Sequence, residues 1–218
     1  MGTFYILRNH TPEVYTTNSG YIFGTQYNIK YKSVEDLHEE IKGTLLQVDN
    51  SLSMFNRNSI ISAFNSNRDT TANEMFTEVF NLAQEISAKT DGAFDITVAP
   101  LVNAWGFGFK NGKLPSDDLV CKTLADCGMR RLVKDMSAVI ADGCLAPGDM
   151  LATEADALPA LNYNAVAQGY SCDVIARYLY SLGVKDMMVN IGEIFCDGVN
   201  PSGLPWTIGI DRPVDGNN

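Results

Sequence analysis

The sequence predicts a globular protein built from both α-helices and β-strands. From Gly20 to Tyr31, aromatic and β-branched residues recur at the period of a strand. Residues 33–52 and residues 73–89 carry apolar side chains at the spacing of amphipathic helices. Met187 to Ile191 form a short apolar run that is typical of a buried strand. The chain has 218 residues, which is long enough for a substantial core.

The charge balance argues against several classes of partner. The chain carries 16 basic and 26 acidic side chains, which gives a formal net charge of -10. Binding to nucleic acids and to anionic membrane surfaces depends on basic side chains, so we expect neither. No run reaches the roughly 18 apolar residues of a membrane-spanning helix, so no transmembrane segment is predicted. An acidic protein that holds a phosphorylated ligand would need backbone amides or a divalent cation.

The first half of the chain is expected to contain one strand and two long helices. Residues 1–19 are predicted to be an irregular lead-in to the strand. Gly24 lies inside that strand, where it indicates a bulge or a close approach of the backbone to another group. Ser33 is the predicted N-cap of the first helix. The second helix is expected to bury Met75, Val79, Leu82 and Ile86.

The second half is expected to add two helices, a hairpin and two strands. Ser116 is the predicted N-cap of a short helix that ends at Gly128. Its inward-facing residues are expected to be Leu119, Val120, Leu124 and Cys127. Residues 131–141 predict a β-hairpin. A run of small residues then leads into a helix that Gly183 ends, and residues 206–211 predict a last strand.

One stretch, Thr90 to Gly108, has no regular amphipathic pattern, and irregular chain of this kind usually builds a site. Asp91 and Gly92 predict a turn. Asp95 lies between two apolar residues, where its carboxylate must meet a backbone amide, a cation or a ligand hydroxyl. A carboxylate that caps the loop and a carboxylate that contacts a ligand are equally open interpretations.

Other groups of residues are weaker candidates for chemistry. The two histidines, His10 and His38, are both expected at the surface. The sequence contains neither a Walker loop nor the glycine-rich motif of dinucleotide-binding folds. Asp173 is expected to be a helix-surface or hydrogen-bonding residue. Glu193 follows Gly192 at the end of a strand, where ligands reach the backbone, so it is the better candidate for a site.

The order and spacing of these segments resemble the ApbE family of FAD:protein FMN transferases, from about Gly20 to the last residue. The most distinctive part is Gly-Ala-Phe-Asp at residues 92–95, followed by Thr97, Pro-Leu at residues 100–101 and Trp-Gly-Phe-Gly at residues 105–108. The other segments that carry the resemblance are Gly24-Thr25 with Tyr27, Ser53 to Phe55 with Ser59 to Asn65, Ala165 to Asp173, Asn190 to Glu193 and Trp206 to Pro213.

The resemblance implies an α+β fold with mixed or antiparallel sheets and packed helices, in a T-fold-like architecture. It implies a single domain from residue 20 to residue 218. It also implies Mg²⁺-dependent transfer of the FMN half of FAD to a threonine hydroxyl of a partner flavoprotein, with release of AMP. In such phosphoryl transfer a metal neutralises pyrophosphate charge while a base accepts the hydroxyl proton.

Site residues are also implied by the resemblance. Phe23 stands where the family has a methionine beside the flavin, Phe55 where it has an aromatic residue against the cofactor, and Ala165 where a backbone carbonyl helps to hold the metal. The FAD-binding residues implied in this way are Phe23, Gly24, Thr25, Phe55, Asp95, Gln168, Gly192 and Glu193.

Three departures from the family pattern limit what is implied. Gln168 replaces the usual lysine, so a neutral amide stands where an ammonium would contact phosphate. Residues 190–193 contain one glycine where the family usually has two. The chain resembles the N-terminal two-thirds of the family, and the later histidine and Ala-Asp-Ala-x-x-Thr motifs have no counterpart. Residues 155–158 are a chance match to the second motif, since they precede Ala165 and lack its threonine. Catalytic residues therefore stay unassigned.

Two alternatives to the transferase are left open. Gln168 and the missing motifs favour a non-catalytic or degenerate FAD-binding protein, or an FAD pyrophosphatase. The other alternative is a structural remnant that binds no ligand. The family usually works outside the cytoplasm, often as a lipid-anchored bacterial protein. The resemblance therefore implies a periplasmic or membrane-anchored location, with a leader removed before Met1.

Overall fold

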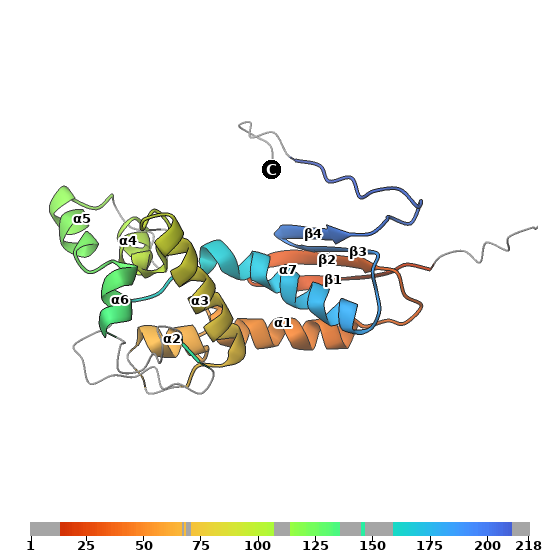
Figure 1. Ribbon diagram of the computed structural model, residues 1–218, viewed down its shortest axis with the longest axis horizontal. Helices are drawn as coiled ribbons and strands as arrows, with labels where there is room; N and C mark the ends of the chain where they lie inside the picture. The colour runs from red at the N-terminus through yellow and green to blue at the C-terminus, as the bar shows by residue number, and fades with distance from the viewer. Residues whose placement is uncertain are drawn as a thin grey trace, which may run out of the picture. The chain divides into compact units, whose positions relative to one another are not determined.

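The structure is a computed structural model that describes residues 14–66, 68, 71–106, 114–135, 145–146 and 159–210. The chain divides into two compact units, one formed by residues 1–41 with residues 172–218 and the other by residues 42–171. A four-stranded sheet lies in the first unit, and a group of helices forms the second (Figure 1). Helices and an antiparallel sheet together confirm the predicted α+β class. Within the described residues, no helix has the length and hydrophobicity needed to cross a membrane.

The sheet of the first unit consists of β1 (Thr16–Ile22), β2 (Thr25–Tyr31), β3 (Met187–Ile191) and β4 (Glu193–Asp197). Every neighbouring pair is antiparallel, in the order β1-β2-β3-β4. Side chains alternate along each strand, so one face of the sheet is buried. The buried residues of the two central strands are Tyr27, Ile29, Tyr31, Met187, Val189 and Ile191. β3 confirms a predicted strand, whereas β4 is an addition to the prediction.

The prediction of one strand from Gly20 to Tyr31 is wrong, because the chain reverses at Phe23 and Gly24. These residues have positive φ angles of 53° and 76°, the backbone conformation of a type I′ hairpin turn. Side chains alternate on both sides of the turn, which is why the sequence pattern looks continuous. β1 begins at Thr16, so the predicted irregular lead-in is wrong for residues 16–19.

A tyrosine of β2 explains why the first helix begins later than predicted. The Tyr31 hydroxyl donates to Oδ1 of Asn18 (2.8 Å) and accepts from the backbone N–H of Leu37 (2.8 Å). These bonds fix the connection after β2 in a non-helical course. The Ser33 hydroxyl accepts from the backbone N–H two residues later (3.0 Å), which is a local turn and not a helix cap. α1 accordingly covers His38–Leu52.

The helices of the second unit include α2 (Ile60–Asn65), α3 (Glu74–Lys89), α4 (Ala99–Ala104), α5 (Asp117–Leu124) and α6 (Met129–Asp135), with a 3-10 turn η1 (Ile96–Val98) before α4. α7 (Asn164–Ser181) begins in the second unit and ends in the first. The side chains of Asn73 and Ser116 accept from backbone N–H groups at the starts of α3 and α5. Both caps confirm the predicted helix starts.

Aromatic side chains fill the core of the second unit. The ring of Phe76 lies 5.4 Å from that of Tyr163 and 6.1 Å from that of Phe64, measured between centroids. The Tyr163 hydroxyl is buried and has no hydrogen-bond partner within the described part of the chain. Burial alone raises the pKa of Tyr163 well above its usual value of 10. Tyr163 therefore contributes to the core through its ring.

Of two predicted helix faces, that of α3 is right for Val79 and wrong for Leu82, and that of α5 is wrong. α3 buries Phe76, Val79, Phe80, Ala83 and Ser87, whereas Leu82, which was expected to be buried, is 49% exposed. The buried face thus lies about one residue further along the helix than predicted. None of the residues of α5, all of which are described, is buried. Its apolar side chains do not face inward as predicted.

Two predicted strand regions also differ from the structure. Residues 131–135 belong to α6, so the predicted hairpin is wrong there, and residues 136–141 lie outside the described residues. Residues 206–210, all of which are described, form no strand, and residue 211 lies outside the described residues. The chain before residue 206 makes an isolated bridge between Val199 and Pro205.

We predict that Gly20→Ala destabilises the sheet. Gly20 pairs with Tyr27, and a Cβ atom at Gly20 would lie 2.5 Å from the Tyr27 hydroxyl oxygen. That hydroxyl also lies 3.1 Å from Nε2 of His38, which limits movement of the ring. Overpacking should lower the free energy of unfolding by about 1–3 kcal/mol, measured by urea denaturation.

Gly43→Ala is the control for this substitution. Gly43 lies within α1, and nothing is found within 4 Å of a Cβ atom placed there. The added methyl group should raise the free energy of unfolding by about 1 kcal/mol through helix propensity. Equal stability of the two alanine variants would contradict the packing described for Gly20.

Candidate functional site

The predicted site residues of the first unit gather at two turns. Residues 23–25 lie at the turn between β1 and β2, and Gly192 and Glu193 lie at the turn between β3 and β4. Neighbouring strands are antiparallel and Asn28 pairs with Asn190, so both turns lie at the same end of the sheet. The structure therefore brings Phe23, Gly24, Thr25, Gly192 and Glu193 to one end of one sheet.

The turn between β3 and β4 needs only one glycine. Gly192 has a φ angle of 89°, and the residues on either side of it pair with each other. The Asn190 side chain accepts from the Gly192 N–H (3.2 Å), which further fixes the turn. A pocket of about 550 Å³ is lined by residues that include Ser19, Tyr21, Gln26, Asn28 and Asn190. The single glycine is therefore compatible with an ordered turn.

Cys172 and Asp173, at the centre of α7, are not placed as reactive groups. The Cys172 thiol donates to the carbonyl oxygen of Glu193 (3.3 Å). Burial is the main cause that raises the pKa of Cys172 to about 11, so the thiol stays protonated near neutral pH and is a poor nucleophile. Asp173 is exposed on the helix, which confirms the expected surface position.

The predicted site residues of the second unit are Phe55, Asp95, Ala165 and Gln168. Phe55 follows α1 and is 60% exposed. Ala165 and Gln168 lie in the first two turns of α7, a helix of 18 residues. The N–H of Asn164 is capped by the Asn162 side chain, and those of Val166 and Ala167 donate to the Tyr163 carbonyl. What the start of α7 offers an anionic ligand is therefore mainly the positive end of the helix dipole.

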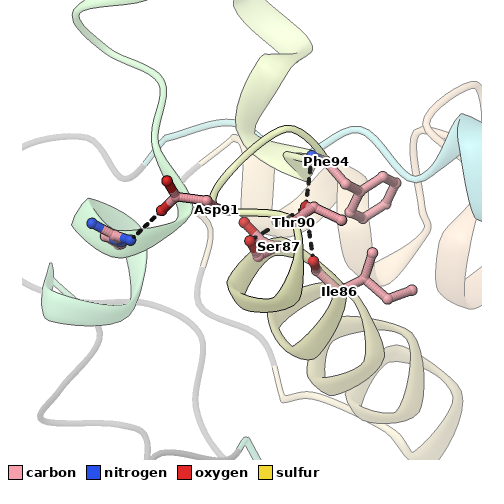
Figure 2. Close-up of polar contacts among 6 residues, drawn as sticks. Ile86, Ser87, Thr90, Asp91 and Phe94 are labelled. Atoms are coloured by element: carbon pink, nitrogen blue, oxygen red, sulfur yellow. Dashed lines mark hydrogen bonds and ion pairs between the residues drawn. The ribbon is translucent and has the colours of Figure 1, made fainter.

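The loop that precedes Asp95 is fixed to the end of α3. The Thr90 hydroxyl donates to the Ile86 carbonyl (2.9 Å) and accepts from the Phe94 N–H (3.1 Å), as Figure 2 shows. Asp91 and Gly92 have positive φ angles of 51° and 85°, which confirms the predicted turn. The Asp91 carboxylate pairs with Arg130 of α6 at 2.9 Å. Both side chains are about nine-tenths exposed, so this pair adds little stability.

Asp95 is a cap for two helical segments. Its Oδ1 atom accepts from the backbone N–H (2.7 Å) and the hydroxyl (2.6 Å) of Thr97, at the start of η1. Its Oδ2 atom accepts from the backbone N–H of Met129 (3.2 Å), the first residue of α6. The buried Thr97 hydroxyl in turn accepts from the Gly128 N–H (2.6 Å). The loop-capping interpretation of Asp95 is confirmed, and direct contact with a ligand stays a prediction.

These capping bonds also explain the helix that replaces the predicted hairpin. The first residue of a helix leaves its backbone N–H without an intrahelical partner. Asp95 supplies that partner from 34 residues earlier in the chain. A pocket of about 520 Å³ lies beside this contact and is lined by residues that include Ser87, Gly92, Asp95, Gly128 and Arg130.

Residues 161–162, which we call the junction, connect three segments that carry the family resemblance. The Asn65 side chain at the end of α2 accepts from the Leu161 N–H (2.7 Å) and donates to the Leu161 carbonyl (2.8 Å). The Ile96 carbonyl of η1 accepts from the Asn162 N–H (2.7 Å). The Asn162 side chain accepts from the N–H of Asn164, where α7 begins (2.8 Å). α2, the Asp95 loop and the start of α7 therefore meet at the junction.

Asn65, Thr97 and Asn162 were not assigned roles from the sequence. Asparagine and threonine side chains readily bond to backbone groups, but their partners here are 31 or more residues away in two of the three cases.

The described residues contain no group of three or more His, Cys, Asp or Glu side chains arranged to hold a metal ion. The Ala165 carbonyl assigned to a metal would therefore need further oxygen ligands, such as those of a bound phosphate. Residues 155–158 lie outside the described residues.

We predict that Thr97→Val loosens the contact between the Asp95 loop and α6. Valine keeps the shape of threonine but removes the hydroxyl, so the Gly128 N–H loses its partner. The free energy of unfolding should fall by about 1–3 kcal/mol in urea denaturation, and hydrogen exchange should rise at residues 128–132.

Thr77→Val is the matched control for this variant. Thr77 is also buried, but its hydroxyl donates only to a carbonyl of its own helix, that of Glu74 (2.8 Å). Its loss should leave exchange at residues 128–132 unchanged. Similar exchange in both variants would contradict the role given to Thr97.

Comparison with known proteins identifies the family of the chain. Residues 23–218 match the ApbE family. The FAD:protein FMN transferase of Vibrio cholerae is 31% identical over 207 residues, which cover 89% of this chain and 58% of the relative. That of Escherichia coli K12 is 29% identical over 224 residues, which cover 97% of this chain and 60% of the relative. The chain thus spans less than two thirds of the length of these curated relatives.

Solved structures give the same result for the fold. The flavin transferase ApbE from Vibrio cholerae has a TM-score of 0.77 at 30% identity, covering 93% of this chain and 65% of that one. The apo form of the Pseudomonas stutzeri flavinyl transferase ApbE has a TM-score of 0.75 at 28% identity, covering 96% and 67%. The family match covers most of the sequence, and the chain therefore belongs to the ApbE family.

Proposed function

We propose that this chain acts in Mg²⁺-dependent transfer of the FMN moiety of FAD to a threonine hydroxyl of a partner flavoprotein, with release of AMP. The observation that carries the proposal is the match to proteins named FAD:protein FMN transferase along nearly the whole chain. The junction at residues 161–162 supports it, because it joins three of the segments that carry the resemblance.

Several described residues suit a flavin nucleotide. Phe55 is largely exposed and offers an aromatic face to an isoalloxazine ring. Phe23, at the tip of the β1–β2 hairpin, is a second aromatic residue assigned to the flavin. The backbone of the Asp95 loop is held rigidly by its own capping bonds, which suits a loop that must fit a ligand.

The pyrophosphate of FAD would lie at the start of α7. The helix dipole favours an anion there, and Gln168 adds a neutral side-chain donor. The chain has a formal net charge of -10, so a cation is needed to offset the pyrophosphate charge. Mg²⁺ would supply that charge, held by phosphate oxygens and the Ala165 carbonyl. An oxygen donor at Ala165 fits the ligand preference of Mg²⁺.

We also propose a location outside the cytoplasm, as a periplasmic or lipid-anchored protein, because the family resemblance implies it. The partner would be a flavoprotein with an acceptor threonine. Detection of the native protein in an isolated periplasmic or membrane fraction tests this, and recovery only with cytoplasmic markers would overturn it.

Ligand binding tests the proposed function first. FAD with Mg²⁺ should raise the melting temperature of the chain, and chelation by EDTA should remove most of the effect. AMP release followed by chromatography, with FMN fluorescence retained on a denatured threonine-containing acceptor, then tests transfer. Free FMN together with AMP would identify a pyrophosphatase instead. Absence of any stabilisation by millimolar FAD would overturn the proposal.

Gln168→Lys should strengthen FAD binding. A lysine at the start of α7 would add an ammonium near the pyrophosphate, for a gain of about 1 kcal/mol, or roughly fivefold in affinity. Calorimetry at two salt concentrations should show a steeper loss of affinity with salt than in the original chain.

Gln47→Lys is the control, because Gln47 is exposed on α1 and has no assigned role in the site. It adds the same charge and should change FAD affinity little. If both lysine variants gain equally, the effect is one of net charge and the placement of Gln168 is wrong.

A further inference from the structure

The amide of Asn65 binds the main chain of another segment as a neighbouring strand would. Its oxygen accepts from the Leu161 N–H (2.7 Å) and its nitrogen donates to the Leu161 carbonyl (2.8 Å). Leu161 is fully buried, so loss of these bonds would leave two polar backbone groups without partners in an apolar setting. The pair of bonds fixes both the position and the direction of the chain at residue 161.

The residues that follow Leu161 pass this constraint on to α7. The Asn162 N–H is held by the Ile96 carbonyl (2.7 Å), and the Asn162 side chain caps the N–H of Asn164 (2.8 Å). The helix starts at Asn164, so Ala165 and Gln168 lie one to four residues beyond this cap. A helix is stiff, and a change in its first residues moves every group in its first turns.

We infer that Asn65 is a positioning residue for the proposed flavin site. Asn65 fixes the position of the start of α7, which carries Ala165 and Gln168, relative to the Asp95 loop. Asn65 itself is not one of the residues assigned to ligand contact. This inference rests on the proposed function for its ligand, but the alignment of α7 that it describes is a property of the chain alone.

The chain contains a matched control for Asn65. Asn81 of α3 makes the same two bonds with the main chain of Leu145, which is also buried, at 3.0 Å to its N–H and 2.9 Å to its carbonyl. Neither Asn81 nor Leu145 belongs to a segment assigned to the ligand. Alanine at either position removes the same chemistry from the same unit of the structure.

The test compares Asn65→Ala with Asn81→Ala in the whole chain. Both variants should lower the melting temperature by similar amounts. Asn65→Ala should raise hydrogen exchange at residues 161–167 and weaken FAD binding in the presence of Mg²⁺ by about tenfold or more, measured by calorimetry. Asn81→Ala should raise exchange near Leu145 and leave FAD affinity within about twofold of the original.

Asn65→Asp separates the two bonds. Aspartate keeps the acceptor for the Leu161 N–H but places a second acceptor against the Leu161 carbonyl, so FAD affinity should fall at least as far as in the alanine variant. Equal loss of FAD affinity in Asn65→Ala and Asn81→Ala would overturn the inference. If the original chain binds no FAD, the proposed function fails. The positioning role of Asn65 is then tested by hydrogen exchange alone, and unchanged protection of residues 161–167 in Asn65→Ala would overturn it.

Discussion

The course of residues 90–98 depends on local hydrogen bonds to the end of α3 and on hydrogen bonds to residues that are distant in the sequence. All of these residues are described, and their regular structure is a single 3-10 turn after the end of α3. Asp95 and Thr97 bind the start of α6, while the Ile96 carbonyl binds Asn162. Three consecutive residues thus connect the loop to two other helices. Without these distant bonds the loop would lose its connection to α6, and the start of α7 would lose one of the contacts that support it.

Local signals in the sequence predicted local structure well. Asn73, Ser116 and Gly183 each mark a helix end with a residue whose effect reaches only a few positions, and the structure confirms all three. Two other local signals were wrong, because Ser33 does not cap α1 and α5 ends at Leu124, before the predicted end at Gly128. The hairpin predicted at residues 131–141 failed because the cap of α6 comes from Asp95, far outside any local window. The strand predicted from Gly20 to Tyr31 failed because phenylalanine is not a residue that signals a type I′ turn.

The candidate site was predictable in its segments and not in its connections. The resemblance pointed to the Asp95 loop and to the start of α7, and the structure joins them at the junction. The asparagine that supports this contact has its partner 96 residues away, and nothing in a single sequence identifies that partner. Asp95 was left open between a cap and a ligand group, and the three hydrogen bonds that it accepts show how its carboxylate is satisfied between two apolar residues.

Phe23 shows a conflict between folding and side-chain placement. Its φ angle of 53° belongs to the left-handed region, which costs an L-residue with a bulky side chain about 1–2 kcal/mol. Asparagine or glycine would suit the same turn better. Backbone strain of this kind persists only where the surrounding structure holds it in place. The hairpin would thus gain stability from glycine or asparagine at the position that the family resemblance assigns to the flavin.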